Sequence, residues 1–395
     1  MQNAYFKETY MNKKLKIFTA VVAVGTAFTV AGCGGCSSCS SCNGAVAPNT
    51  ITRSNWYTGT SYSGIQPSFI ITDDDNTYAD YAEKLTYEVT YSAPEEGKGN
   101  PNYAVEYDKG TFKTEFYATV FSWKKAGIPA GYADSKVESE TVYVYKTTLD
   151  ISGKFTMKVG DKGEKSFTDH VETESWFRAA GKNLQPVYSK QVLKNTYPAL
   201  LQPTTIEQAC KELDATYENY YDYNCTKVLS KVTQNGKTEE KEYGKLDKLS
   251  NVLFDNSSLY IVARSFLKTS SAVSQYVCLF NAVAEGADTY AVTGSDAQLT
   301  DTERKDYATV LSKKDLFKKE SDEAKVGATA VSVSFAGGDL HGTAQTIWYA
   351  SVTNADNNTS RSTMLKMSVP ISFSLGTLNY SLTEVNSTLW NGYNA

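Results

Sequence analysis

The sequence predicts a mainly β protein with a few short helices. Apolar and polar residues alternate over most of residues 84–385, and turn-forming residues separate the alternating stretches. Only three segments show helical spacing instead. The chain has 395 residues, of which 41% are hydrophobic and 21% charged. Such a composition can build a core and is not typical of a disordered protein.

The clearest strand pattern is in residues 84–92, where Leu85, Tyr87 and Val89 share one face of the predicted strand. Asn235-Gly236 supplies two residues that accept positive φ, so it predicts a tight hairpin between residues 226–234 and 237–243. The same alternation predicts strands at residues 111–120 (with Phe112, Phe116, Ala118 and Val120 facing inward), 141–150, 153–159, 165–178, 331–335, 343–352, 361–369, 371–375 and 377–385. Pro370 favours a bulge or a sheet edge.

Three segments are predicted to be helical. Residues 204–217 carry apolar side chains at helical spacing behind a capping-box pattern, Thr205 with Gln208. Residues 255–267 follow a possible Asp or Asn cap. Residues 301–320 are highly charged, with Tyr307 on the apolar face.

The N-terminal segment has the organisation of a secretory signal. A cationic stretch at residues 11–16 precedes a small and apolar run at 17–30, and Val-Ala-Gly-Cys ends at Cys33. The run of 14 residues is shorter than the 20 or so that span a bilayer, which argues against the alternatives of a membrane anchor or a buried helix. Residues 1–10 fit no part of a signal, so we expect that Met11 could be the true start.

Val-Ala-Gly-Cys resembles the lipobox of bacterial lipoproteins. The resemblance implies cleavage before Cys33, diacylglycerol on its thiol, and a protein held on the extracytoplasmic face of the cell membrane. We therefore expect a signal peptide at 1–32, a Cys/Gly/Ser-rich tether at 33–50 and one β-rich exported domain at 51–395, since no linker-like break follows residue 50. The exported part carries 35 basic and 43 acidic residues, a balance that predicts no nucleic-acid partner.

Seven cysteines fall into two groups. Cys33, Cys36, Cys39 and Cys42 repeat every three residues, a spacing that can hold a metal or an iron–sulfur cluster. With Cys33 lipidated and flexible Gly and Ser between the others, we interpret the segment as a tether and predict no metal or cofactor. The remaining thiols there could be acylated, disulfide-linked or free. Cys210 and Cys225 could pair, which would leave Cys278 as an odd third.

Further stretches resemble a domain family of unknown function from bacterial envelope proteins. The similar segments are residues 85–91, the helix-like 254–266 and the closing strands within 348–385. The family's fold is similar to that of periplasmic lipoprotein carriers. The resemblance therefore implies a long antiparallel, strongly curved sheet, a half-barrel, around a few short helices. It implies no established activity.

Enzymatic motifs are missing from the sequence. Neither histidine, His170 or His341, lies in a zinc-binding or nucleophile-elbow pattern, and no phosphate-binding loop is present. Asp73-Asp74-Asp75 could offer oxygens to calcium but lacks the other ligands of a calcium loop, so a solvated turn is favoured. We therefore predict that the protein is not an enzyme.

The 28 tyrosines suggest a stacking surface for sugar or peptide. The candidate residues are Trp56, Tyr57, Tyr217, Tyr220, Tyr221 and Tyr223, although tyrosine also fills half-buried sheet positions. Three functions stay open: a tethered binding or carrier domain for an apolar, lipid or envelope-derived ligand, a structural or adhesive surface protein, and a cell-wall or glycan hydrolase. We favour the first. Lysine pairs at 313–314 and 318–319 could contact anionic lipid, although a solvated helix face is favoured.

Overall fold

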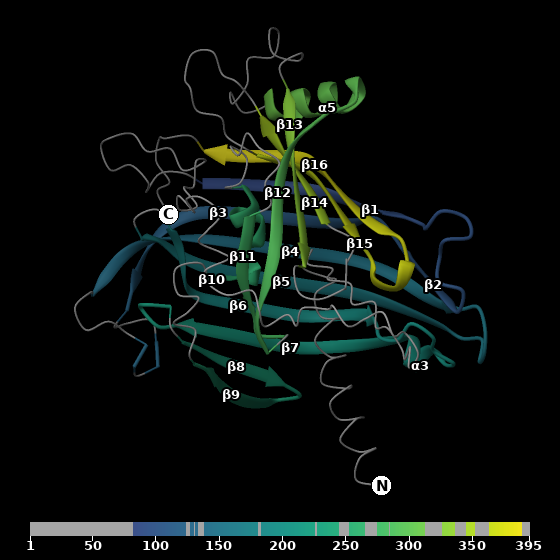
Figure 1. Ribbon diagram of the computed structural model, residues 1–395, viewed down its shortest axis with the longest axis horizontal. Coiled ribbons are helices and arrows are strands. Elements are labelled where there is room, and N and C mark those ends of the chain that lie inside the picture. The colour runs from purple at the N-terminus through teal and green to yellow at the C-terminus, as the bar shows by residue number, and fades with distance from the viewer. Residues whose placement is uncertain are drawn as a thin grey trace, which may run out of the picture.

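The computed structural model describes residues 82–123, 127–129, 131–132, 138–180, 183–225, 227–244, 253–264, 275–283, 285–312, 326–335, 345–351 and 363–388. Within these ranges the chain forms strands that all belong to one sheet, plus a few short helices (Figure 1). The strands are β1 (Ala82–Ser92), β2 (Tyr103–Tyr107), β3 (Gly110–Ser122), β4 (Ser139–Met157), β5 (Glu164–Ala180), β6 (Asn183–Pro198), β7 (Cys210–Tyr221), β8 (Val228–Gln234), β9 (Lys237–Tyr243), β10 (Leu253–Asp255), β11 (Gln275–Asn281), β12 (Gly286–Ala297), β13 (Gly327–Phe335), β14 (Gln345–Ser351), β15 (Met364–Pro370) and β16 (Thr377–Thr388). The helices are α3 (Ile206–Ala209), α4 (Leu259–Arg264) and α5 (Asp301–Ser312), with 3₁₀ turns η5 (Asn256–Ser258) and η7 (Ser372–Ser374).

The sheet is almost wholly antiparallel. Its strand order runs β10-β11-β12-β13-β14-β15-β16-β1-β3-β4-β5-β6-β7-β8-β9, and β2 pairs with β4 beside this path. Only the β10–β11 pairing is parallel. The first described strand, β1, lies between β3 and the last, β16, so the two halves of the chain are joined through β1.

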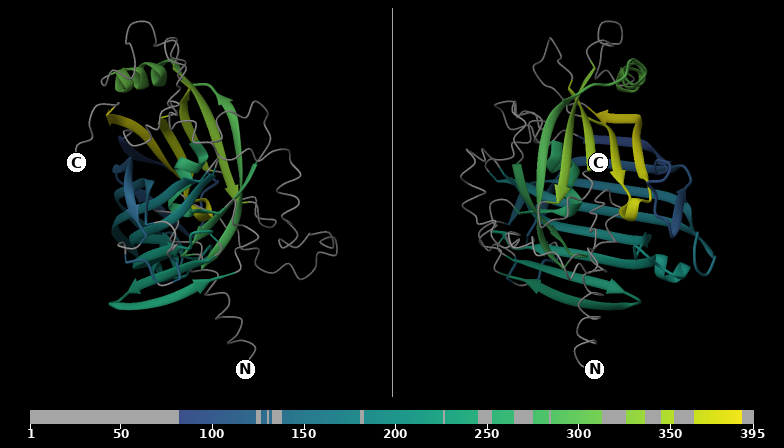
Figure 2. Two further views of the ribbon diagram at one scale, coloured as in Figure 1. Left: turned by 90° about the vertical axis from the view of Figure 1, so that its left-hand side faces the viewer. Right: turned by 45° about the vertical axis from the view of Figure 1, so that its right-hand side comes forward.

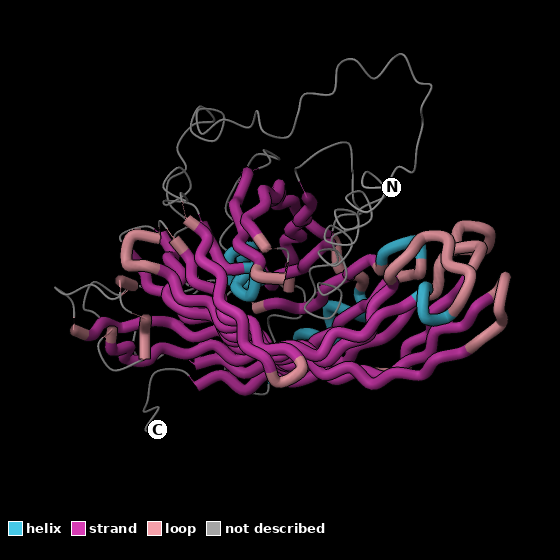
Figure 3. Tube along the Cα trace, turned by 90° about the horizontal axis from the view of Figure 1, so that it is seen from below, coloured by secondary structure: helices cyan, strands magenta, loops and turns pink. Residues whose placement is uncertain are grey.

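The expected half-barrel is wrong: the sheet is neither closed nor strongly curled. Strands β3–β7 run side by side as a broad platform (Figure 1), and seen from below the layer of strands is bent but open (Figure 3). Strong curvature requires repeated bulges or glycine kinks. The pairings within the platform contain a single register shift, between Trp176 and Phe177.

Strands β11–β14 run across the face of the platform at a steep angle, and the two layers are separate in a side view (Figures 1 and 2). Helix α4 lies between them, and all six of its residues are buried. The Tyr260 ring meets Phe112 of β3 with ring centroids 6.0 Å apart, and the Tyr260 carbonyl accepts a 2.6 Å hydrogen bond from Tyr349 of β14. The space between the layers is therefore packed with side chains around α4.

The layers are also joined by buried polar contacts centred on Asp255, at the end of β10. Its carboxylate accepts hydrogen bonds from the Ser189 hydroxyl of β6 (2.6 Å), from the Tyr221 hydroxyl of β7, and from the Ser257 backbone N–H (2.8 Å). The Ser257 contact is the helix cap that the sequence predicts. Because these groups are almost completely buried, each needs its partner inside the protein.

A second buried contact joins α4 to β1. The Arg264 guanidinium forms a bidentate pair with the Glu83 carboxylate, at 2.9 and 3.2 Å, and both side chains are at most 5% exposed. Two parallel N–H···O bonds fix the orientation as well as the distance of such a pair. The pair thus holds the C-terminal end of α4 against the strand that joins the two halves of the chain.

The outer face of the sheet, from β1 across the platform to β9, carries a row of charges of alternating sign. Cross-strand pairing places one such residue opposite the next over eight strands: Lys84, Glu115, Lys146, Glu174, Lys190, Glu218, Lys231 and Glu240. Three of the pairs are within ion-pair distance, 2.7 Å for Lys84–Glu115 and 3.0 Å for Lys231–Glu240 among them. Opposite charges across a ladder stabilise it modestly, and a slip of one residue would lose every pair.

Most predicted strands are confirmed, among them β1, β3, β5 and β13–β16. The Asn235-Gly236 hairpin is confirmed by φ values of 53° and 71°. Residues 141–150 and 153–159 form one continuous strand, β4, instead of two. Val120 is 68% exposed instead of facing inward, because Phe121 and Trp123 pack into a cluster on the other face of the sheet. Pro370 ends β15, which has partners on both sides.

Two predicted elements are wrong. Residues 204–217 form only the single turn of α3 and then β7, because β7 pairs with β6 and β8 along both edges and these pairings outweigh a weak helical pattern. Residues 371–375 form the 3₁₀ turn η7, with positive φ at Phe373 and Ser374, instead of a strand. The predicted helices are confirmed at 256–264, as η5 and α4, and at 301–312, while residues 265–267 and 313–320 of those predictions lie outside the described ranges.

We expect the substitution Asp255→Ala to lower the free energy of unfolding by about 3 kcal/mol or more, because it leaves two hydroxyls and one N–H buried without an acceptor. Asp150→Ala, at a largely exposed aspartate of β4, should change it by less than about 1 kcal/mol. Urea unfolding followed by circular dichroism measures both. Equal, small effects would show that the Asp255 contacts do not hold the layers together.

Candidate binding hollow

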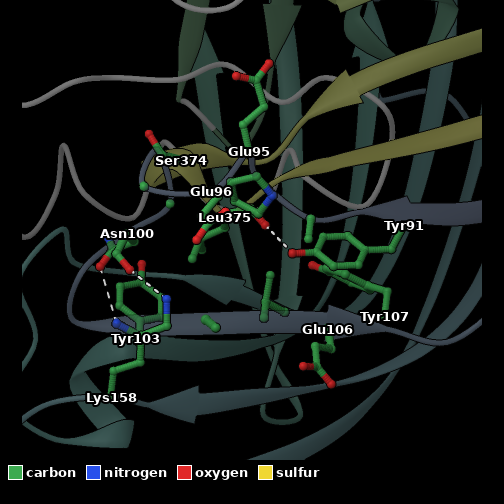
Figure 4. A pocket seen from close by; sticks show the side chains of 16 residues that line it. Tyr91, Glu95, Glu96, Asn100, Tyr103, Glu106, Tyr107, Lys158, Ser374 and Leu375 are labelled. Carbon is green, nitrogen blue, oxygen red and sulfur yellow. Dashed lines mark hydrogen bonds between the residues drawn. The ribbon is translucent and has the colours of Figure 1, made fainter.

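A hollow of about 560 Å³ opens where β1 and β2 diverge (Figure 4). It is bounded by the end of β1, the loop that leads to β2, β2 itself and the turn after β15. Its lining residues are Tyr91, Ala93, Pro94, Glu95, Glu96, Gly97, Gly99, Asn100, Tyr103, Ala104, Val105, Glu106, Tyr107, Lys158, Ser374 and Leu375. This volume is within the range of small-ligand sites.

The position of β2 depends on a close approach to β4. A Cβ atom at Gly153 of β4 would lie 2.4 Å from the Glu106 carbonyl oxygen and 2.5 Å from the Phe167 ring. Only glycine avoids these clashes, so Gly153 lets β2 pair with β4 while the Phe167 ring covers the gap. The sequence shows this glycine, but not the strand that packs on it.

Two tyrosines form one wall of the hollow. The rings of Tyr91 and Tyr107 lie 5.8 Å apart at an angle of 47°, with their hydroxyl ends pointing the same way (Figure 4). The Tyr91 hydroxyl donates to the Leu375 carbonyl at 2.8 Å, whereas the Tyr107 hydroxyl is buried without a partner among the described residues. Burial, followed by the negative charge of Asp169, raises the pKa of Tyr107 well above its usual value. Both tyrosines therefore stay protonated.

The far end of the hollow is held by Asn100. Its buried side chain accepts hydrogen bonds from the backbone N–H groups of Asn102 (2.8 Å) and Tyr103 (3.3 Å), and donates to the Leu201 carbonyl (3.1 Å). The Tyr103 hydroxyl donates to the Leu200 carbonyl at 2.9 Å. These contacts tie the loop before β2 to the segment after β6, so this end of the hollow is preformed.

The rim of the hollow is acidic. Three carboxylates, Glu95, Glu96 and Glu106, line it together with one lysine, Lys158, whose ammonium donates to the Asn100 carbonyl at 3.0 Å. Glu95 is also paired with the nearby Lys98 at 2.5 Å. All three glutamates are exposed. The hollow thus combines aromatic rings, hydroxyls and carboxylates, groups that can bind a ligand by stacking, hydrogen bonding and charge.

A second hollow, of about 640 Å³, lies between α5 and the outer face of β14–β16. Its lining includes Trp348, Tyr307, Glu303 and Lys366. The Lys366 ammonium lies 4.9 Å from the centre of the Trp348 ring and pairs with the Glu303 carboxylate. The main recognition groups of this hollow are therefore engaged with one another.

Several residues singled out by the sequence lie outside the described ranges: Cys33, Cys36, Cys39, Cys42, Trp56, Tyr57, Asp73, Asp74, Asp75 and His341. The side chain of Cys278 is also not described. His170 lies on the outer face of the platform, where its ring meets Asp150 at 2.6 Å and Glu172 at 3.2 Å. These carboxylates, above all the hydrogen bond to Asp150, raise the pKa of His170. No serine contact with this ring is found among the described residues.

The possible pairing of Cys210 with Cys225 is not formed, and both are buried free thiols. Cys210 begins β7, whereas Cys225 lies beyond its other end at Tyr221. At about 3.3 Å per residue the strand separates them by far more than the roughly 7 Å that a disulfide allows. Burial raises the pKa of the Cys210 thiol to about 11 and that of Cys225 to about 12.

The tyrosines of β7 do not share a surface. Tyr217 and Tyr221 are buried on the inner face of the sheet, whereas Tyr220 is half-buried on the outer face. Successive side chains of a strand point to opposite faces of the sheet, so these tyrosines are divided between the core and the outer face. The tyrosines that line the hollow beside β2, namely Tyr91, Tyr103 and Tyr107, carry no sequence signal beyond their strand alternation.

No helix in the described part of the chain has the length and apolarity needed to cross a membrane. The described residues also contain no group of three or more His, Cys, Asp or Glu placed to hold a metal ion. Comparison with known proteins finds no matching family model, no matching curated protein and no matching solved structure. The resemblance to the carrier-like envelope family therefore stays a prediction.

Beneath Tyr107 lies Asp169, a buried carboxyl of β5 whose Oδ1 accepts the Thr196 N–H at 2.8 Å. Burial raises its pKa from 3.8 to about 7. The folded protein thus holds this proton more tightly than the unfolded chain does. The stabilisation of the folded protein by protonated Asp169 is fully present below about pH 4 and is lost as the pH rises through 7.

We therefore expect stability to fall by up to about 4 kcal/mol between pH 4 and 8 on account of Asp169. Asp169→Asn, which keeps an acceptor for Thr196, should flatten this part of the profile and stabilise the protein at pH 8. Asp296→Asn, at an exposed aspartate of β12, serves as the control. Urea unfolding at a series of pH values measures the effect, and an unchanged slope in Asp169→Asn would contradict it.

Proposed function

We propose that this protein is a membrane-tethered, extracytoplasmic lipoprotein that binds a ligand of the cell envelope without catalysing a reaction. Lipid on Cys33 would hold it at the cell membrane, and residues 33–50 would space the β-rich domain from the surface. The lipobox-like Val-Ala-Gly-Cys supports the tether. The hollow beside β2 supports the binding role, and it is the observation on which this role depends.

The packing around α4 favours a ligand outside the sheet layers over an apolar cargo between them. The six residues of α4 and the side chains that meet them already occupy that interior. The hollow beside β2, by contrast, is lined by exposed carboxylates and tyrosine rings. Ligand sites typically have a small number of polar groups, held at fixed positions within an aromatic or apolar wall.

The charged groups of the hollow favour binding over catalysis. Its titratable lining side chains are glutamates, tyrosines and one lysine, and burial keeps the pKa of Tyr107 far above physiological pH. A general base or acid works best with a pKa near the operating pH. The groups are therefore suited to holding a ligand.

We expect Cys33→Ala to remove the lipid and to leave the precursor uncut, because the thiol is the predicted acceptor. Mass spectrometry of the protein from its own cells, together with membrane fractionation, measures both effects. Cys36→Ala should stay processed and membrane-bound. A Cys33→Ala protein that is still cut and retained like the parent would overturn the tether.

Ala93→Trp should block ligand binding, because Ala93 is exposed, lines the hollow, and can be enlarged without disturbing the core. Val120→Trp adds the same ring at an exposed site at the far end of β3 and serves as a control. Native mass spectrometry of the mature protein purified from membranes would detect a co-purifying ligand. We expect the parent and Val120→Trp to carry it and Ala93→Trp to lack it. If the parent, Val120→Trp and Ala93→Trp all carried the same amount of ligand, the hollow would not be the binding site.

A further inference from the structure

The edge of β2 that faces away from β4 carries backbone groups, at Val105 and Tyr107, that have no hydrogen-bond partner among the described residues. Lys158 N–H donates to the Asn102 carbonyl at 2.8 Å, and Asp108 N–H donates to the Ser152 carbonyl at 2.9 Å. Hydrogen-bonded positions alternate along an antiparallel strand, so Ala104 and Glu106 bond to β4 between these two. The N–H and C=O groups of Val105 and Tyr107 therefore point to the opposite edge.

No described strand pairs with that opposite edge. β1, which would be its neighbour, leaves its ladder with β3 at the Val89–Gly110 pair, and from there it pairs only with β16 as far as Ser92. The hollow lies where β1 and β2 diverge (Figure 4). A strand edge that lacks a partner strand is a template that another extended chain can join by main-chain hydrogen bonds.

The charges around this edge select the kind of chain that fits. Glu95 is paired with Lys98, but Glu96 and Glu106 together still outnumber Lys158, so a cationic side chain is attracted and an acidic one repelled. The tyrosine rings add a favourable surface for an ammonium or guanidinium group and its alkyl stem. The volume of about 560 Å³ suits a short segment of a few residues.

We propose that the hollow binds a short basic peptide segment, which adds as an extended strand to the free edge of β2 and sets its cationic side chains against Glu96 and Glu106. This inference rests on the proposed binding function of the same hollow. The main-chain groups of Val105 and Tyr107 bind the peptide backbone, and the carboxylates select the basic side chains. The unpaired Tyr107 hydroxyl lies buried in the wall beneath this edge.

The test uses the mature, lipidated protein in detergent with two probes, acetyl-Lys-Val-Lys-Val-amide and acetyl-Glu-Val-Glu-Val-amide. Amide hydrogen exchange is read by mass spectrometry with fragmentation that resolves single residues. At saturating basic peptide we expect exchange at Val105 and Tyr107 to slow by about tenfold or more. Ala104 and Glu106 already donate to β4, so their unchanged exchange is the internal control. The acidic peptide should leave all four amides unchanged.

Glu96→Gln and Glu106→Gln should each weaken the basic peptide about threefold, the effect of one partly screened charge pair. Glu240→Gln, an exposed carboxylate on the distant strand β9, is the matched control and should bind as the parent does. The weakening should shrink as salt is added. If neither Glu96→Gln nor Glu106→Gln weakened binding of the basic peptide, these carboxylates would not select basic side chains.

The outcomes separate the two proposals. Basic peptide that binds without slowing Val105 and Tyr107 overturns strand addition, and equal binding of the acidic peptide overturns the basic preference. If neither peptide binds while Ala93→Trp still abolishes the native ligand, the hollow is a binding site and only the peptide inference fails. If Ala93→Trp has no effect on the native ligand, the proposed function itself fails.

Discussion

The buried carboxylate of Asp255 is the contact on which the arrangement of this fold most depends. It stands at the end of the parallel strand β10 and takes hydrogen bonds from the platform, through Ser189 and Tyr221, and from the first turn before α4, through Ser257. An isolated buried carboxylate would be costly, so it is tolerated only where donors surround it. These directional bonds set where the crossing strands lie on the platform, which apolar contacts alone would leave less defined.

The placement of the hollow beside β2 follows from that packing. Because α4 fills the space between the layers, the inner face of the sheet has little room for a ligand beside it. The hollow forms instead at the margin, where the long strand β4 extends past β3 and takes β2 as a second partner. Gly153 permits this second pairing, so one residue without a side chain decides where the sheet has an inner edge that no described strand pairs.

The outer and inner faces of the platform use polar residues for different purposes. The outer row of alternating charges, from Lys84 to Glu240, is solvated and pins the pairing register of eight strands. The inner face places small polar residues such as Ser189, Gln191 and Asn219 opposite the Asp255 segment, where they are buried and hydrogen-bonded. A register slip would exchange the two sets, so the two faces together favour a single pairing.

The sequence by itself determined the strand-rich character of the chain, the Asn235-Gly236 hairpin and a helix cap at Asp255 or Asn256. Each depends on residues a few positions apart, whose geometry is local. Only the tertiary structure decided that residues 210–221 form a strand, that Cys210 and Cys225 stay apart, and that Lys84 and Glu115 begin a row that ends at Glu240. It alone placed Tyr91 beside Tyr107 at an open edge. These facts depend on which strands pair across long separations, and pairing is selected by the burial of whole faces, which no short pattern contains.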